Sequence, residues 1–141
     1  MKNLKAKISD PLHKDFELKN EAVLNEYLDL PSSHWSSGSG DSALQKDEAD
    51  GLMFFKLDTN AYFVMEISSY LSPIQNQDDI TWMKHYISGE PFFFSSRYLC
   101  SKETLLKTLI EYARSGKKHD DFKWADPIPD EDLYFKLLNE E

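Results

Sequence analysis

Residues 52–67 read "LMFFKLDTNAYFVMEI", two runs of strand-forming residues on either side of the turn "DTN" at 58–60. This pattern predicts a β-hairpin. Both faces of the second run are largely apolar, because Phe63, Met65 and Ile67 alternate with Tyr62, Val64 and Glu66. Since a strand that is apolar on both faces must be covered on both, we expect this hairpin at the centre of a sheet covered by helices.

Shorter elements are predicted around the hairpin from strand formers, N-caps and helical spacing. We expect strands at 16–18, 42–46, 91–96 and 121–124, and helices at 21–30, 102–115 and 130–141. This order predicts an α+β fold, a single domain over 1–141 with a mainly antiparallel sheet of about five strands and two to four helices packed on it. Residues 1–12 are expected to be a tail or an edge strand, and 127–141 an acidic C-terminal helix.

Two connecting segments stand out. Residues 68–91 are expected to be a long connection, with a helical turn or two in "DDITWMKHYISG", and connections of that length are often functional. The Ser/Gly-rich segment 32–42 is expected to be a mobile surface connection. Its Trp35 either packs back onto the core, which is the commoner outcome, or is displayed to a partner.

The charge balance limits the classes of partner. The 141 residues carry a net charge of −9, which disfavours direct binding to nucleic acid or anionic membranes and favours a basic protein partner. The alternative is that the acidity only keeps the protein soluble. Eight acids against two lysines fall within residues 120–141. The single cysteine, Cys100, and the lack of a signal-length apolar run predict a cytoplasmic protein.

No constellation of residues predicts catalysis. The four histidines lack metal-ligand spacing, and the run His119, Asp120, Asp121 is more typical of a solvated turn. Cys100 adjoins a helix N-terminus, and that position lowers the pKa of a thiol. No base that could partner Cys100 stands beside it in the sequence. We therefore expect no enzyme activity, no metal and no cofactor.

Three segments together resemble the first-numbered family of bacterial immunity proteins for polymorphic toxins. They are the apolar hairpin Leu52–Ile67, the Ser-x-Glu helix Ser101–Gly116 and the short strand Phe122–Trp124. The sequence is also similar to the immunity protein of a double-stranded-DNA cytidine deaminase toxin. The resemblance implies a cytoplasmic inhibitor that binds the C-terminal domain of one cognate toxin and blocks its active site. It also implies that Trp124 belongs to the family architecture; because it shares a strand face with Phe122, we expect it in the core.

The predicted partner-binding surface combines the 68–91 connection with the acidic C-terminal region. Aromatic residues dominate such interfaces, and carboxylates around them steer a basic partner. The predicted residues are Asp78, Asp79, Trp82, Tyr86, Glu90, Asp120 and Asp121. The alternative function is a small acidic adaptor or regulatory module that binds another basic protein.

Overall fold

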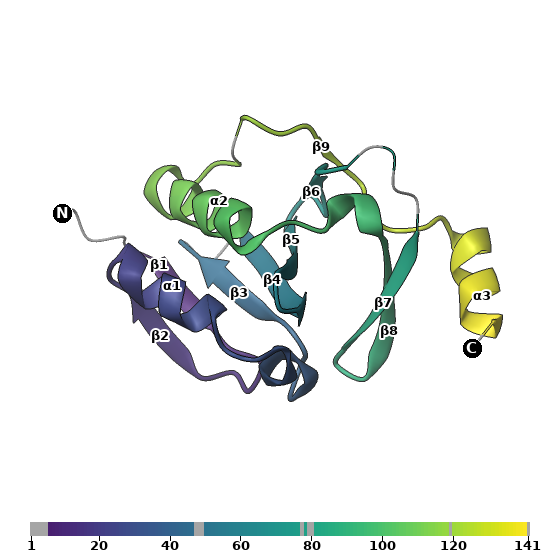
Figure 1. Ribbon diagram of the computed structural model, residues 1–141, viewed down its shortest axis with the longest axis horizontal. Coiled ribbons are helices and arrows are strands. Elements are labelled where there is room, and N and C mark those ends of the chain that lie inside the picture. Colours follow the sequence, from purple (N-terminus) through teal and green to yellow (C-terminus); the bar gives the residue numbers. More distant parts are fainter. Residues whose placement is uncertain (1–5, 47–49, 77, 79–80, 119, 141) are drawn as a thin grey trace.

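The largest element is a five-stranded antiparallel sheet with strand order β2-β1-β3-β4-β5 (Figure 1). The computed structural model describes residues 6–46, 50–76, 78, 81–118 and 120–140. Within these ranges the strands of the sheet are β1 (Ala6–Ser9), β2 (Asp15–Leu18), β3 (Ser42–Gln45), β4 (Gly51–Asp58) and β5 (Ala61–Glu66). Three α-helices accompany it in the described part of the chain, so the predicted α+β class is confirmed.

Two positions in the sheet differ from the prediction. The first strand, β1, pairs with both β2 and β3 and is therefore an interior strand, not a tail or an edge. The β4–β5 hairpin lies at one end of the sheet rather than at its centre. The hairpin is still buried, because backbone groups of later segments hydrogen-bond to the outer edge of β5. Tyr62 and Cys100 exchange two hydrogen bonds of 2.9 Å, and the amide of Glu66 donates to Leu71.

Helices α1 (Glu21–Leu28) and α2 (Lys102–Ser115) cover one face of the sheet (Figure 1). Each begins at the predicted cap. The side chain of Asn20 accepts a bond from the Val23 amide, and that of Ser101 accepts one from the Thr104 amide. α2 ends at Gly116 with φ of +73°, a left-handed conformation that glycine adopts without steric cost.

A buried lysine joins β4 to the end of α1. Lys56 Nζ donates to the carbonyls of Leu28 (3.2 Å) and Leu30 (2.9 Å), and the Tyr62 hydroxyl donates to Leu28 at 2.7 Å. The last carbonyls of a helix have no partner within the helix, and a cation there also complements the helix dipole. The contact therefore gives the buried ammonium group two carbonyl acceptors and gives the end of α1 two side-chain donors.

The opposite face of the β4–β5 hairpin is covered by a second hairpin, formed by β7 (Trp82–Ile87) and β8 (Glu90–Ser95). The predicted helical turns in 78–89 and the long irregular 68–91 connection are therefore wrong. Half-buried residues alternate along the chain from Met83 to Ile87, which is the two-residue period of a strand. Ser88 and Gly89 both have positive φ, as a tight two-residue hairpin turn requires.

The Ser/Gly-rich segment is held by specific contacts. It contains a 3-10 helix, η1 (Ser32–Ser36), whose Trp35 is fully buried and donates its indole N–H to Ser42 Oγ at 2.9 Å. A Cβ on Gly40 would lie 2.2 Å from the Tyr86 carbonyl oxygen. The segment is thus packed between the sheet and the β7–β8 hairpin, not a free surface connection.

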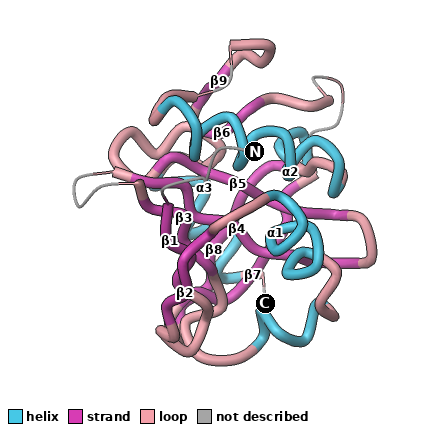
Figure 2. The backbone as a smooth tube through the Cα atoms, turned by 90° about the vertical axis from the view of Figure 1, so that its left-hand side faces the viewer, coloured by secondary structure: helices cyan, strands magenta, loops and turns pink. Residues whose placement is uncertain are grey.

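The last part of the chain runs along one end of the molecule. β9 (Trp124–Ala125) pairs with β6 (Ser72–Pro73), and both lie at the top of the views in Figures 1 and 2. A second 3-10 helix, η2 (Ser96–Tyr98), follows β8, and α3 (Glu131–Asn139) closes the described chain as predicted. Trp124 is half-buried at the margin of the core, so its predicted place inside the core is wrong. Within the described ranges, every helix is too short or too polar to cross a lipid bilayer.

The two tryptophans give a test of this fold. Trp35→Ala removes a fully buried ring and leaves Ser42 without its indole donor, so we expect a loss of about 3–5 kcal/mol in unfolding free energy. Trp124→Ala should cost less, below about 3 kcal/mol, because the ring is half-buried. Urea unfolding of both variants measures the difference. A Trp124→Ala loss equal to or greater than that of Trp35→Ala would contradict this packing.

Candidate protein-binding surface

The β7–β8 hairpin presents one face to the sheet and one away from it. Cross-strand partners in an antiparallel pair share a face, so His85 and Phe92 point toward the sheet while Tyr86 and Pro91 point away. Trp82 lies on the same outward face as Tyr86. Its side chain is half-buried, whereas Tyr86 is 51% exposed, with the Lys84 ammonium 5.2 Å from its ring centre. Two predicted anchors thus occupy one face.

Helix α3 extends this outward face. Its Tyr134 ring packs against Phe93 of β8 at 5.6 Å, and the neighbouring Phe135 is 52% exposed. None of the residues of α3 is fully buried, so the helix packs on the surface of the hairpin and is not part of the hydrophobic core. Figure 1 shows it standing beside the hairpin at the right of the molecule. We define the aromatic face as Trp82, Tyr86, Phe93, Tyr134 and Phe135.

Carboxylates lie around the aromatic face. Asp130 caps α3 by accepting a bond from the Leu133 amide at 2.8 Å, and Glu131 and Asp132 follow in the first turn. Glu90, a predicted site residue, is exposed beside the hairpin turn, but it pairs with Ile87 and so lies on the face opposite Tyr86. Acids in a first helical turn also complement the helix dipole, so these groups stabilise α3 as well as setting the surface charge.

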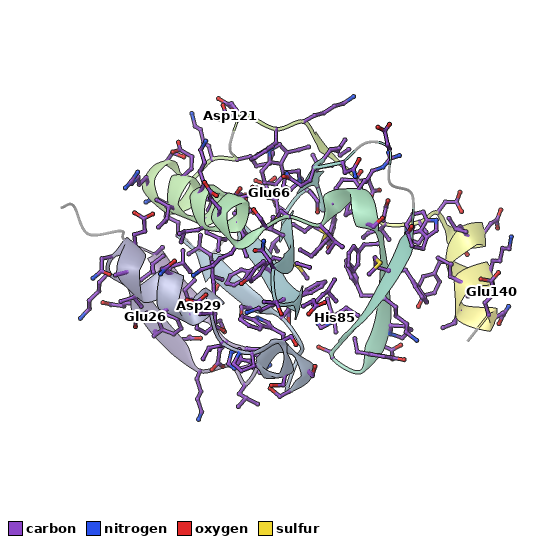
Figure 3. The ribbon with its side chains drawn as sticks, in the orientation of Figure 1. Glu26, Asp29, Glu66, His85, Asp121 and Glu140 are labelled. Atoms are coloured by element: carbon purple, nitrogen blue, oxygen red, sulfur yellow. The ribbon has the colours of Figure 1, made fainter. Side chains whose placement is uncertain are left out.

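Two other predicted acids, Asp120 and Asp121, lie away from this face. Asp78 is exposed beyond β6, and Asp120 and Asp121 lie between α2 and β9. Figure 3 labels Asp121 at the top of the molecule, whereas the tip of the β7–β8 hairpin lies at the bottom. Asp121 is also paired with Lys107 at 3.4 Å. The structure therefore does not bring the described members of the predicted set into one patch, and Asp79 lies outside the described residues.

The inward face of the hairpin is fixed by a histidine. His85 stacks on Phe55 with ring centres 4.0 Å apart, and its Nε2 donates to the Gly40 carbonyl at 2.8 Å (labelled in Figure 3). Burial lowers the pKa of His85 from its ordinary value, against the opposing effects of the Gly40 carbonyl and the Asp41 carboxylate. The neutral imidazole thus acts as a packing and hydrogen-bonding group.

Two nucleophilic side chains, Cys100 and Ser42, are buried. Burial raises the pKa of the Cys100 thiol to about 12, so the predicted effect of the helix N-terminus is outweighed. Ser42 Oγ is buried between the Tyr27 hydroxyl (2.7 Å) and the Trp35 indole. Burial also raises the pKa of Tyr27 to about 12, and the Tyr27 hydroxyl lies between Ser42 Oγ and the His34 imidazole, 3.0 Å from Nε2. In the part of the chain that the structure describes, no three His, Cys, Asp or Glu side chains converge as metal ligands.

Sequence reasoning missed Tyr134 and Phe135 as surface residues. The acidic first turn predicts the C-terminal helix, but that signal says nothing of which of its aromatics are exposed. The usable signal was the adjacency of Tyr134 and Phe135, because neighbouring positions on a helix point in different directions. A helix that buries only one stripe leaves one of two such aromatics exposed.

Comparison with known protein families finds no match for this chain, and no curated protein matches it.

The buried histidine predicts a pH dependence of stability. Since burial lowers the folded-state pKa of His85, protonation favours the unfolded chain. The unfolding free energy should keep its full value above the ordinary histidine pKa of 6.5 and fall as the pH drops below it. His34, whose pKa burial also lowers, contributes in the same direction. Burial raises the folded-state pKa of Asp41, so protonation of this carboxylate favours the folded chain. Its effect therefore opposes that of the two histidines as the pH falls toward 3.8, the ordinary aspartate value.

Urea unfolding of His85→Gln at pH 7.5, 6.5 and 5.5 tests the assignment. The variant should show a shallower loss of stability toward low pH than the wild type. His13→Gln changes an exposed histidine and serves as the control. An unchanged pH dependence in His85→Gln would overturn the assignment of this histidine.

Proposed function

We propose that the protein is an immunity protein, a non-catalytic inhibitor that binds the C-terminal domain of a cognate bacterial toxin and blocks its active site. The likeness of three sequence segments to an immunity family supports this proposal. The observation that carries it is the aromatic face, where Tyr86 and Phe135 are exposed on a hairpin packed onto the sheet and on a helix packed onto that hairpin.

Exposed aromatics on a preorganised scaffold are the usual anchors of a protein interface. Tyr and Trp are enriched among the few residues that dominate binding, and they cluster where a partner excludes water. Tyr86 and Phe135 are more than half exposed, although both are large enough to bury considerable apolar area. The outward face of the hairpin is therefore better suited to a partner than to solvent.

Charge supports a basic partner. A toxin that acts on nucleic acid needs a cationic surface for phosphates, and a chain of net charge −9 attracts that surface. Glu131 and Asp132 lie in the first turn of α3, beside Tyr134 and Phe135 of the aromatic face, where they act at short range. Asp120 and Asp121 lie between α2 and β9, away from the aromatic face, and we assign them, with Asp78 in the connection before β7, to steering of the encounter. Cytoplasmic action and the absence of catalysis belong to the same proposal.

Co-expression with the toxin domain encoded by the adjacent upstream gene tests this function. The wild-type chain should restore growth. Tyr86→Ala and Phe135→Ala should weaken binding by roughly 30-fold or more each, as hot-spot truncations do. Leu12→Ala, at another exposed apolar residue that is 54% accessible, is the matched control and should bind normally.

Charge reversal separates contact from steering. Glu131→Lys with Asp132→Lys should slow association and speed dissociation, whereas Asp120→Lys with Asp121→Lys should slow association alone, and only at low salt. Failure of the wild type to protect cells would contradict the immunity function and favour the acidic adaptor. Normal binding by both aromatic variants would reject the aromatic face.

A further inference from the structure

An open apolar groove lies on the face of the sheet opposite α1 and α2. The β7–β8 hairpin covers only the part of this face around Phe55 and Phe63, and the remainder forms a cavity of about 330 Å³. Most of its lining is apolar and comes from the sheet, the hairpin and the residues after β5: Ala43, Met53, Met65, Ile67, Ile87 and Phe92, with Tyr70. A cavity of this size and composition is typical of ligand sites.

Asp41 supplies a carboxylate at the groove. It directly precedes β3 on the face that Ala43 shares with Met53, and it is half-buried. Its titratable neighbours are His13 and His85, and Ser39 supplies a hydrogen bond. No ion pair joins Asp41 to a lysine or arginine in the described residues. Burial raises the pKa of Asp41, because the desolvated carboxylate is not paired with a lysine or arginine that would stabilise its charged form.

Tyr70 borders the same groove in an unusual conformation. Its φ is +59°, a left-handed value that is uncommon for a bulky residue, and its side chain is 59% exposed. The Tyr70 amide donates to the Glu66 carbonyl at 2.9 Å, which fixes the turn after β5. Backbone strain of this kind occurs at sites that hold a ligand. The Tyr70 ring thus lies against the groove, and the left-handed backbone conformation that places it there costs free energy.

We propose that this groove receives a single lysine or arginine side chain of the protein partner, with the aliphatic stem on Met53 and Met65 and the cation at Asp41. The inference rests on the proposed function, because it requires a basic partner. Long cationic side chains bury their stems on apolar surface while the head finds a charge. Methionines suit this role since their flexible thioethers adapt to an inserted chain. The groove would add a defined contact to the aromatic face.

A titration without the partner tests the chemistry of the groove. The protein carries 13C-methyl methionine, and the probes are hexylamine and, as matched controls, hexanoate and hexanol. Hexylamine should shift the Met53 and Met65 methyl signals saturably and leave Met83, which does not line the groove, unchanged. Asp41→Asn should abolish the response. Equal responses to all three probes, or an undiminished response in Asp41→Asn, would overturn the proposal.

A second measurement uses the toxin domain. Asp41→Asn should weaken its binding at least tenfold, and the control Asp58→Asn, at an exposed aspartate of the β4–β5 turn, should bind as wild type does. Normal binding by Asp41→Asn would overturn the assignment of the groove to this partner. If the wild type itself does not bind the toxin domain, the proposed function fails and the methyl titration decides the groove alone.

Discussion

Both faces of the β4–β5 hairpin are largely apolar, so exposing either face to water is unfavourable. The other elements are arranged so that they cover these two faces. Leu52 and Phe54 point to one side of β4, and Met53 and Phe55 point to the other, all of them buried. Two helices cover the first face. A two-stranded hairpin covers part of the second. Each cover is fixed by one polar residue that is buried against backbone carbonyls, Lys56 on the helix side and His85 on the hairpin side.

The way in which the β7–β8 hairpin covers the sheet accounts for both candidate contact surfaces of this domain. An isolated two-stranded hairpin is marginally stable in water, so β7–β8 depends on the rings of Phe55 and Phe63 beneath Phe92 and Phe94. Its outward face is not needed for that packing and is free to carry Tyr86. Its limited width leaves the groove beside Asp41 open. Both candidate contacts therefore arise from the same incomplete cover of the sheet.

Local signals in the sequence predicted much of this arrangement. Caps at Asn20 and Ser101 and the acidic first turn of α3 predict the helices, and strand formers predict β4, β5 and β8. Strand order was not predictable, because β1 between β2 and β3 is set by long-range pairing that no local pattern encodes. β7 was taken as helical because Asp78 and Asp79 resemble the start of a helix and aromatics fall on both sides of the strand.

The candidate site was predictable only in part. Residue type predicts Trp82 and Tyr86, since aromatics are typical of interfaces, and the structure places both on one face of the hairpin. Their role in binding stays a prediction. The separation of Asp120 and Asp121 from the hairpin depends on where the chain runs between α2 and β9, which is a tertiary property. Asp41 carried no signal either, because an aspartate after Gly40 is typical of a turn. Its half-buried position becomes evident only when the hairpin is placed over the sheet.

Hydrogen exchange of the protein alone and in complex with the upstream toxin domain tests the central claim, that the partner binds the hairpin side of the molecule. The account predicts slower exchange on binding in β7, β8 and α3 and in the Tyr70 turn, with α1 and α2 unchanged. Slower exchange confined to α1 and α2 would place the partner on the opposite face and contradict the account.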